Sequence, residues 1–349
     1  MREEPGGLDK RKAYILATVV YEYIATAEPV GSQTLTQKYQ LGVSSATVRN
    51  EMAELEAGGY LVQPHTSAGR IPSDAGYRTY VDQLMQPEEL AIDDRRRIRD
   101  ELHDASRQLD DIIENTTRLL GRLSNNLAFV TKPHQETQTF RQVQLIWLTP
   151  RTGVAIVVTS LGVAAQSLFE LSEEVPADDM TRFSNALNAR FENRPLRDLA
   201  DADVTAVARE IGAHEDLRGA VLSALQAARS NEQPTIASAG AQNLLDQPEF
   251  QDLRKLRSIL RIVEEQKTLY QIVADAMSAE TPSVKIGREL GNEELADLSI
   301  VTVPYRFGAH AHGMLAILGP RRMPYGRLVA LASGTADSLS ERLSDVERH

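Results

Sequence analysis

The stretch SSATVRNEMAELEAGGYLVQPHTSAGRI, residues 44–71, decides the fold expected at the N-terminal end of this chain. Its first half predicts a helix over 44–57, because Val48, Met52 and Leu55 recur at helical spacing and fall on one face. Such a helix buries that face against neighbouring elements and leaves the opposite face free.

The free face of this helix has the composition of a DNA-reading surface. Ala46 and Ala53 are small enough to permit close approach to a major groove. Arg49 and Asn50 can form paired hydrogen bonds with guanine and adenine edges respectively. Hydroxyl groups near the helix N-terminus can add contacts to bases or phosphates. These hydroxyls belong to Ser44, which is also a good N-cap, and to Ser45 and Thr47.

A β-hairpin is expected directly after this helix, over residues 60–72. Residues 60–62 read as a short apolar strand, residues 63–69 as a loop to which Gly69 gives backbone freedom, and residues 70–71 as a return strand. Polar side chains in this region are suited to contacts with the DNA backbone or the minor groove. They are those of His65, Thr66, Ser67 and Arg70.

Further helices are expected on both sides of this region. Residues 9–27 and 32–39 carry helical patterns, and a glycine-containing turn joins the second of them to the reading helix, as in a helix-turn-helix motif. After the hairpin, Ser73 caps another helix, and Arg78 in its first turns is placed to reach the DNA backbone.

Composition limits the classes of function. The chain has 349 residues, a formal net charge of −11 and no cysteine, which excludes disulfides, thiolate nucleophiles and cysteine-ligated metals. Neither a secretory leader nor an apolar run long enough for a membrane span is evident, so we expect a cytoplasmic protein without membrane contact. Residues 1–85 hold eight Lys or Arg against ten Asp or Glu, so DNA contacts there must come from a few well-placed groups.

The rest of the chain alternates between helical and strand patterns. After Pro87 we expect one long amphipathic helix linking two domains, with a coiled coil as the alternative. Its apolar stripe consists of Ile98, Leu102, Ala105, Leu109, Ile112, Thr116, Leu119 and Leu123. Three antiparallel strands are expected over 141–171. Helices are then expected over 178–191, 203–211, 214–228, 253–277 and 325–343, and strands over 284–286, 299–307 and 312–320.

Several segments resemble the HrcA family of bacterial heat-inducible transcription repressors. They are residues 43–82, NLLDQPEFQDLRKLRSIL at 243–260, SIVTVPYRFG at 299–308 and GMLAILGPRRMPYGRLV at 313–329. The first of them, VSSATVRNEMAELEAGGYLVQPHTSAGRIPSDAGYRTYVD, joins the reading helix, the hairpin and the following helix in one block.

The resemblance implies an α+β multidomain fold. Residues 1–87 would form a winged helix-turn-helix DNA-binding domain. Residues 88–140 and 231–349 would form a GAF-like α/β domain that includes the linker helix. Residues 141–230 would form an inserted dimerisation domain, a three-stranded antiparallel sheet with helices.

The resemblance also implies a repressor of heat-shock chaperone operons. It would bind an inverted-repeat operator in double-stranded DNA as a homodimer, lose activity on heating and depend on the chaperonin. The expected DNA-binding residues are Ser44, Ser45, Ala46, Thr47, Arg49, Asn50, His65, Thr66, Ser67, Arg70 and Arg78. We expect no catalytic residues, cofactor or metal.

Other interpretations of the sequence remain open. The main alternative is a ligand-responsive regulator that uses its GAF-like domain as a small-molecule sensor. His310 and His312 alternate on an expected strand as a metal pair would, but a third ligand is not evident. An enzyme fused to a winged helix would need a catalytic constellation, and His65 with Ser67 lacks the GxSxG context of a hydrolase.

Overall fold

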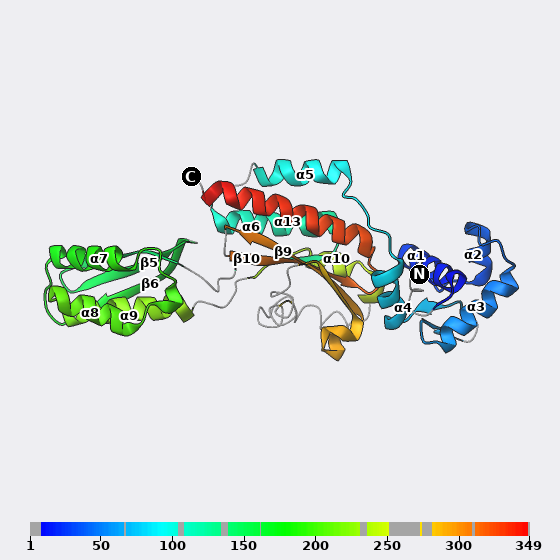
Figure 1. Ribbon diagram of the computed structural model, residues 1–349, viewed down its shortest axis with the longest axis horizontal. Helices are drawn as coiled ribbons and strands as arrows, with labels where there is room; N and C mark the ends of the chain where they lie inside the picture. Colours follow the sequence, from blue (N-terminus) through cyan, green and yellow to red (C-terminus); the bar gives the residue numbers. More distant parts are fainter. Residues whose placement is uncertain are drawn as a thin grey trace. The chain divides into compact units, whose positions relative to one another are not determined.

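The computed structural model is a mixed α+β protein that forms two compact units (Figure 1). The first unit comprises residues 1–132, 236–306 and 313–349, and the second comprises residues 133–235 and 307–312. The structure describes residues 8–65, 68–103, 108–133, 139–160, 162–230, 236–250, 273, 281–308 and 311–347. Within these residues, no helix combines the length and apolar character needed to cross a membrane.

The first unit begins with an N-terminal module, residues 8–84, whose elements follow the order expected from the sequence. They are α1 (Lys10–Thr26), α2 (Ser32–Lys38), α3 (Ser45–Ala57), β1 (Leu61–Val62), β2 (Ile71–Pro72), α4 (Asp74–Thr79) and the π-helical turn η2 (Tyr80–Leu84). Asp9 caps α1 by accepting hydrogen bonds from the backbone N–H groups of Arg11 and Lys12. The turn between α2 and α3 contains Gly42 at φ +67°, a left-handed conformation that favours glycine.

The remainder of the first unit, here the C-terminal body, is built on a five-stranded sheet in the order β7-β3-β10-β9-β8. The strands are β3 (Leu127–Thr131), β7 (Ile236–Ala239), β8 (Ser283–Ile286), β9 (Leu298–Phe307) and β10 (Ala311–Pro320). Its helices are α5 (Ile92–His103), α6 (Leu109–Ser124), α10 (Ala241–Leu245), α13 (Tyr325–Glu347) and the short 3-10 turns η4 (Pro248–Phe250), η5 (Gly287–Leu290) and η6 (Glu293–Leu295). Figure 1 shows α6 and α13 lying along the sheet with α5 outside them.

The prediction of a single long helix after Pro87 is wrong. The chain forms two separate helices, α5 and α6, and Gln108 just before α6 has an extended backbone at φ −79° and ψ 131°. The helices lie side by side, with Arg122 donating to Glu101 at 2.7 Å. An apolar residue at every third or fourth position is compatible with one long helix, and equally with two shorter helices that pack against the same neighbour. Here α5 and α6 both pack against α13. The helix expected over 253–277 lies outside the described residues, apart from Val273, which is helical.

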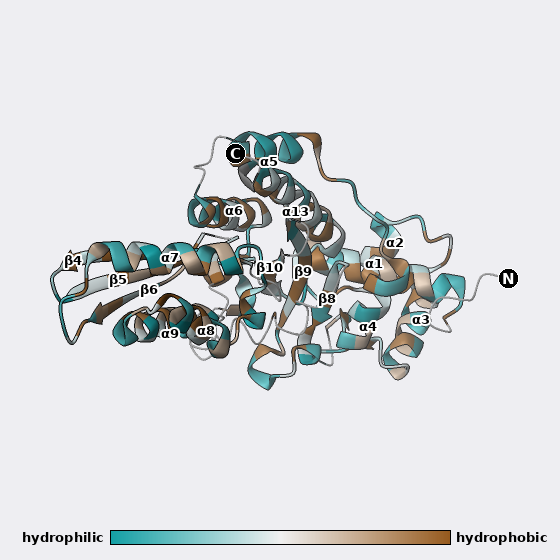
Figure 2. Ribbon diagram, turned by 60° about the vertical axis from the view of Figure 1, so that its left-hand side comes forward, coloured by the Kyte–Doolittle hydropathy of each residue, from teal (hydrophilic) through white to brown (hydrophobic). Residues whose placement is uncertain are grey.

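The second unit is a three-stranded antiparallel sheet with helices on one face, in agreement with the segments expected to be strands. Its strands are β4 (Phe140–Thr149), β5 (Thr152–Thr159) and β6 (Gly162–Glu170), and its helices are α7 (Ala177–Phe191), α8 (Asp201–Ile211), α9 (Glu215–Ser230) and the short turn η3 (Leu196–Asp198). Residues of β5 alternate between buried and half-buried, the pattern of a strand with one covered face. The helices change between teal and brown along their length in Figure 2, as amphipathic helices do.

Candidate nucleic-acid interface

Helix α3 has one buried and one exposed face, as its sequence predicts. Val48, Met52 and Leu55 are each no more than 3% exposed, and they anchor α3 in the core of the N-terminal module. Arg49 and Asn50 are exposed, as are Ala46 and Ala53 on the same side. The helix therefore presents a free surface with two small residues and two that can hydrogen-bond to bases.

Hydroxyl groups organise the N-terminus of α3. Ser44 is the N-cap, and its hydroxyl accepts a hydrogen bond from the backbone N–H of Thr47 at 3.2 Å. The hydroxyls of Ser44 and Thr47 also lie 3.0 Å apart. Ser45 is half-buried, and its hydroxyl lies 3.0 Å from that of Ser32 at the start of α2. Ser45 thus fixes α3 to α2, and a contact from its hydroxyl to DNA stays a prediction.

A third segment extends the β1–β2 hairpin. Arg70 and Val30 exchange backbone hydrogen bonds of 2.8 and 2.9 Å, which joins the chain ahead of α2 to the hairpin. Gly69 makes this pairing possible, because a Cβ at this position would meet the Val30 carbonyl oxygen at 2.3 Å. The expectation that Gly69 supplies backbone freedom is wrong, since its φ is not among the positive values found in this chain. Glycine is required at position 69 because the Val30 backbone leaves no room for a side chain.

The tip of the hairpin is closed by two hydrogen bonds. The backbone N–H of Ala68 donates to the carbonyl of His65 at 2.9 Å, and the Gln63 amide donates to the carbonyl of Ala68 at 3.0 Å. His65 is exposed at this turn, so its ring is free to meet a phosphate. Thr66 and Ser67, the other expected contacts of the tip, lie outside the described residues.

The two other arginines assigned to the DNA backbone are engaged with carboxylates. Arg70 pairs with Glu56 of α3 at 2.8 Å, and only 18% of its side chain is exposed. Arg78 binds Glu289 of the C-terminal body and Asp82 of η2. Hydrogen bonding to Glu289 raises the pKa of Arg78 above its ordinary value, although burial opposes this. A DNA contact from either arginine stays a prediction and would require it to leave its carboxylate.

Most other cations of the N-terminal module are also paired. Arg11 lies 3.1 Å from Glu51 and Lys12 lies 2.7 Å from Glu54, both on α3. Within the described part of the chain, Arg49 has no carboxylate partner. Arg49 is therefore the arginine of this module that is available to a nucleic acid without breaking an ion pair. The sequence shows how many charges the module carries but not which of them are paired, so the unpaired state of Arg49 among the described residues could not be predicted from it.

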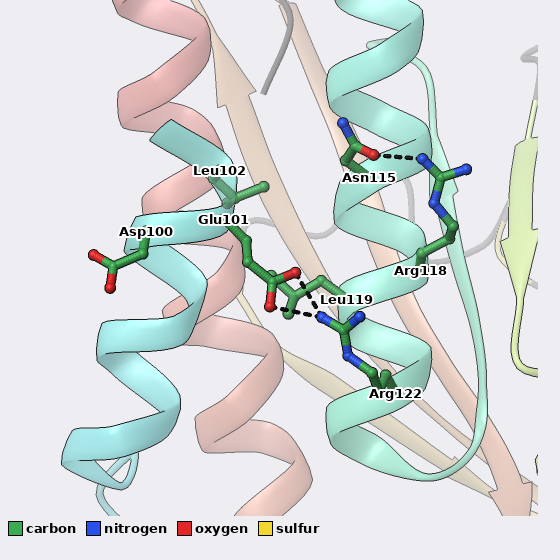
Figure 3. Close-up of a pocket in the computed structure, with 7 residues that line it drawn as sticks. All are labelled: Asp100, Glu101, Leu102, Asn115, Arg118, Leu119 and Arg122. Atoms are coloured by element: carbon green, nitrogen blue, oxygen red, sulfur yellow. Dashed lines mark hydrogen bonds and ion pairs between the residues drawn. The ribbon is translucent and has the colours of Figure 1, made fainter. Parts of the chain in front are cut away.

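A groove of about 380 Å³ lies between α5 and α6 (Figure 3). Its walls are mainly charged and the ion pair of Arg122 with Glu101 crosses it, with the Arg122 side chain 61% exposed. Figure 3 shows Leu102 and Leu119 between the two helices. Since its charged groups are paired or open to solvent, the groove does not gather the convergent buried polar groups that orient a small ligand.

The structure describes only one member of the metal pair considered at His310 and His312. Residue 310 lies outside the described residues, and among those that are described no group of three or more His, Asp or Glu side chains is placed to hold a metal ion. His312 is half-buried on β10.

Comparisons with known proteins identify the family. Residues 110–329 match the model of the HrcA protein C terminal domain. The chain is 37% identical over 342 residues to the heat-inducible transcription repressor HrcA of Pelotomaculum thermopropionicum, covering 98% of each protein. It is also 37% identical over 343 residues to the protein of that name from Moorella thermoacetica, covering 98% of this chain and 99% of the relative.

A solved structure described as a hypothetical protein shares the fold. It has a TM-score of 0.60 and 23% sequence identity, covering 97% of this chain and 99% of the other. The family match spans more than half of the chain, and the relatives match nearly all of it. The chain therefore belongs to the HrcA family of heat-inducible transcription repressors.

Proposed function

We propose that this protein is a sequence-specific DNA-binding repressor of heat-shock chaperone operons. The observation that carries the proposal is the free face of α3, on which Arg49 and Asn50 are exposed while the opposite face is fully buried. A rigid helix with such a face can enter a major groove, where arginine and asparagine distinguish guanine and adenine. The relatives' printed names, heat-inducible transcription repressor, support this role.

In this proposal the N-terminal module is a winged helix-turn-helix domain. α3 reads the major groove, helped by Ser45, Ala46 and Thr47, and the β1–β2 hairpin is the wing. Phosphate contacts come from the N-terminus of α3 at Ser44, and from His65, Thr66, Ser67, Arg70 and Arg78. The pairing of Arg70 with Val30 supports the wing, because it holds the hairpin against the segment ahead of α2. The division into a winged helix at 1–87, a GAF-like domain at 88–140 and 231–349, and an insertion at 141–230 is part of the same proposal.

We further propose that the protein acts as a homodimer through the uncovered face of β4–β6. The pairing registers align Ile146 with Val154 and Val154 with Leu168, which makes a row of apolar side chains across the three strands. Ile146 is 40% exposed and Leu168 is 70% exposed. An exposed apolar row of this kind favours burial against a second copy. A two-fold dimer also matches the symmetry of an inverted repeat, which presents the same half-site twice.

The proposed response to heat acts through the concentration of active dimer. If heating unfolds or aggregates the repressor, less dimer is free to bind and the operators open. The chaperonin would restore the active form. Operator binding that recovers completely after heat treatment without chaperonin would argue against this part of the proposal.

The test of the proposed function is fluorescence anisotropy with an inverted-repeat duplex from the protein's own chaperone promoter, with and without chaperonin. A scrambled duplex measures nonspecific binding. Arg49→Ala removes one good base contact from each half-site, so it should weaken binding of the dimer to the repeat by about a hundredfold or more, and should leave the scrambled duplex less affected. Arg97→Ala is the matched control, because Arg97 is an exposed arginine on α5. It should bind like the natural protein.

Two results would overturn the proposal. One is equal, weak binding of a folded dimer to both duplexes even in the presence of chaperonin. The other is a loss of affinity in Arg97→Ala as large as that in Arg49→Ala. The ligand-responsive alternative would then be tested by a screen for metabolites that shift the thermal midpoint.

A further inference from the structure

Three arginines connect the N-terminal module to the C-terminal body, and each crosses between segments far apart in the sequence. They are Arg78 on α4, and Arg321 and Arg322 between β10 and α13. The connection is reciprocal, because each side contributes both arginines and acceptors. We call Arg78, Arg321, Arg322 and their partners Asp74, Glu249 and Glu289 the arginine joint.

Arg78 reaches from the module into the body. Its Nε donates to Glu289 of η5 at 2.9 Å, and its Nη2 donates to the same carboxylate and to the backbone carbonyl of Val284 in β8 at 2.7 Å. Its Nη1 donates to Asp82 on its own side at 3.0 Å. The Glu289 carboxylate is itself held, since it accepts a hydrogen bond from the backbone N–H of Ile286 at 2.9 Å. A two-point contact of this kind fixes direction as well as distance.

Arg321 reaches in the opposite direction. Its guanidinium donates to Asp74 at the start of α4 at 2.7 Å and to Asp297 of the body at 3.3 Å. The carboxylate of Asp74 lies against Gly287, where a Cβ would come within 2.8 Å of its oxygen. Since Gly287 has a φ of +54°, both space and backbone conformation require glycine there.

Arg322 completes the joint from the body. It binds Glu249 of η4 through two nitrogens, and donates to the Gln247 side chain at 2.8 Å and to the carbonyl of Ile24 near the end of α1 at 3.5 Å. Its side chain is only 15% exposed. A guanidinium so enclosed, with a carboxylate and two further acceptors around it, is held far more firmly than a pair on an open surface.

Aromatic packing lies beside these ion pairs. Tyr77 of α4 and Tyr325 of α13 meet edge to face, with ring centroids 6.0 Å apart, and each is 1% exposed. The Tyr325 hydroxyl donates to the carbonyl of Arg321, which ties the segment carrying two of the arginines to this packing. The joint therefore combines an apolar centre with charged contacts around it.

From this geometry we propose that the arginine joint positions α3 relative to the C-terminal body, and that it thereby selects operators by the spacing of their two half-sites. The inference rests on the proposed function. A dimer engages two half-sites at once only if its reading helices are held at the matching separation. That separation depends on every link between α3 and the proposed dimer contact in the second unit, and the joint is the link between the N-terminal module and the body. A loose link there would tolerate several separations at lower affinity. The joint residues act as positioning residues and need not touch DNA.

The test uses the full-length protein and a set of inverted repeats whose spacers are one or two base pairs shorter or longer than the natural one. An isolated half-site duplex is included. Asp74→Arg and Arg321→Asp each place like charges in the joint, and the double variant Asp74→Arg with Arg321→Asp restores opposite charges. Circular dichroism and thermal melting establish which variants are folded. Glu101→Arg is the matched control, because it removes an ion pair to Arg122 on α5 and α6 outside the joint.

We expect the natural protein to lose about a hundredfold in affinity when the spacer is wrong, since simultaneous engagement is lost. In the folded single variants this ratio should shrink to about threefold, while affinity for the half-site duplex is unchanged. Glu101→Arg should keep the full ratio. The double variant should regain part of it, because opposite charges again face each other at positions 74 and 321 while Asp297 still faces a like charge. If a single variant melts too early to assay, Glu289→Gln is the milder substitute with the same expected direction.

Other outcomes overturn the inference in distinguishable ways. A spacing ratio that stays unchanged in the folded single variants and in Glu289→Gln would refute the role of the joint while leaving DNA binding intact. Equal losses on every duplex in Arg78→Gln, with a normal spacing ratio, would mean that Arg78 acts only as the proposed phosphate contact and has no role in the joint. Failure of the natural protein to bind any duplex, the half-site included, would refute the proposed function and this inference with it.

Discussion

Gly69 lies against the backbone of Val30 so closely that a Cβ atom would come within 2.3 Å of the Val30 carbonyl oxygen and 2.4 Å of its carbonyl carbon. The neighbouring residue, Arg70, exchanges two backbone hydrogen bonds with Val30. Replacing this glycine therefore pushes the hairpin away from the segment to which it is paired. Backbone atoms cannot turn aside as a flexible side chain can, so the contact has no easy relief.

We predict that Gly69→Ala destabilises the N-terminal module by about 1–3 kcal/mol, the usual cost of forcing extra atoms into a packed site. The free energy of unfolding in urea measures this, and operator affinity should fall with it. Gly219→Ala is the control, because a Cβ at that helical position meets nothing within 4 Å. It should leave stability unchanged or raise it by up to about 1 kcal/mol. Equal stability of both variants would contradict the close approach.

The ion pairs within the module lead to a prediction about salt. Counterion release lowers log K by about 0.9 per phosphate neutralised for each unit of log salt. Since Arg11, Lys12 and Arg70 face carboxylates of α3, few cations are free to neutralise phosphates. We expect a slope no steeper than about −4 per dimer, as for about two phosphates per protomer. Affinity measured between 50 and 300 mM salt tests this, and a slope near −10, like that of a strongly basic repressor, would contradict it.

Glu22 leads to a prediction about pH. Its side chain is 7% exposed and binds Lys38 and the hydroxyl of Tyr39, the latter at 2.8 Å. The hydrogen bond from Lys38, aided by that from Tyr39, lowers the pKa of Glu22 below its ordinary value of 4.5, and burial opposes the shift. Because the folded pKa is the lower one, this stabilisation is present above pH 4.5 and is lost as the pH falls through the folded pKa.

We therefore expect Glu22→Gln to be less stable than the natural protein at pH 7, with the difference shrinking as the pH falls below 4.5. Urea unfolding at several pH values between 7 and 3 measures the difference directly. The comparison isolates one group, because all other carboxylates are the same in the two proteins. Glu28→Gln, at an exposed position on the loop after α1, is the matched control and should be about as stable as the natural protein at pH 7. If the difference in stability between the natural protein and Glu22→Gln instead grew as the pH fell, the prediction that folding lowers the pKa of Glu22 would be contradicted.

The sequence predicted what depends on local periodicity and missed what depends on distant partners. Val48, Met52 and Leu55 could be placed on the buried face of α3 because a helix fixes their directions within three turns. The acceptors of Arg78 in the C-terminal body, Glu289 and the carbonyl of Val284, lie more than 200 residues away, so its role in linking module and body could not be read from its own segment.

Two other errors have the same physical origin. The stripe of apolar residues after Pro87 is compatible with one long helix, and only tertiary packing decides that α5 and α6 form a pair. Gly69 looked like a flexible loop residue because its neighbour, Val30, is 39 positions earlier in the chain. The candidate DNA-reading residues needed no such partners. Exposure of Arg49 and Asn50 followed from their place on α3 alone.

The uncovered face of β4–β6 gives the last prediction. Leu168 is 70% exposed at one end of the apolar row that also contains Val154 and Ile146. If this face is the dimer interface, Leu168→Glu places a carboxylate from each copy in an apolar contact, and an unpaired buried charge is costly. We expect the dimer to dissociate at concentrations where the natural protein is dimeric, as measured by sedimentation equilibrium. Binding to an isolated half-site should not change.

Ile92→Glu is the matched control, because Ile92 is an apolar residue 86% exposed at the start of α5, outside the second unit. The same chemical change there should leave the dimer intact. Loss of dimer in Leu168→Glu alone, together with loss of tight binding to the inverted repeat, would link dimerisation to operator recognition through simultaneous engagement of two half-sites. An undisturbed dimer in Leu168→Glu would mean that another surface joins the copies, and the apolar row would then need a different partner to cover it.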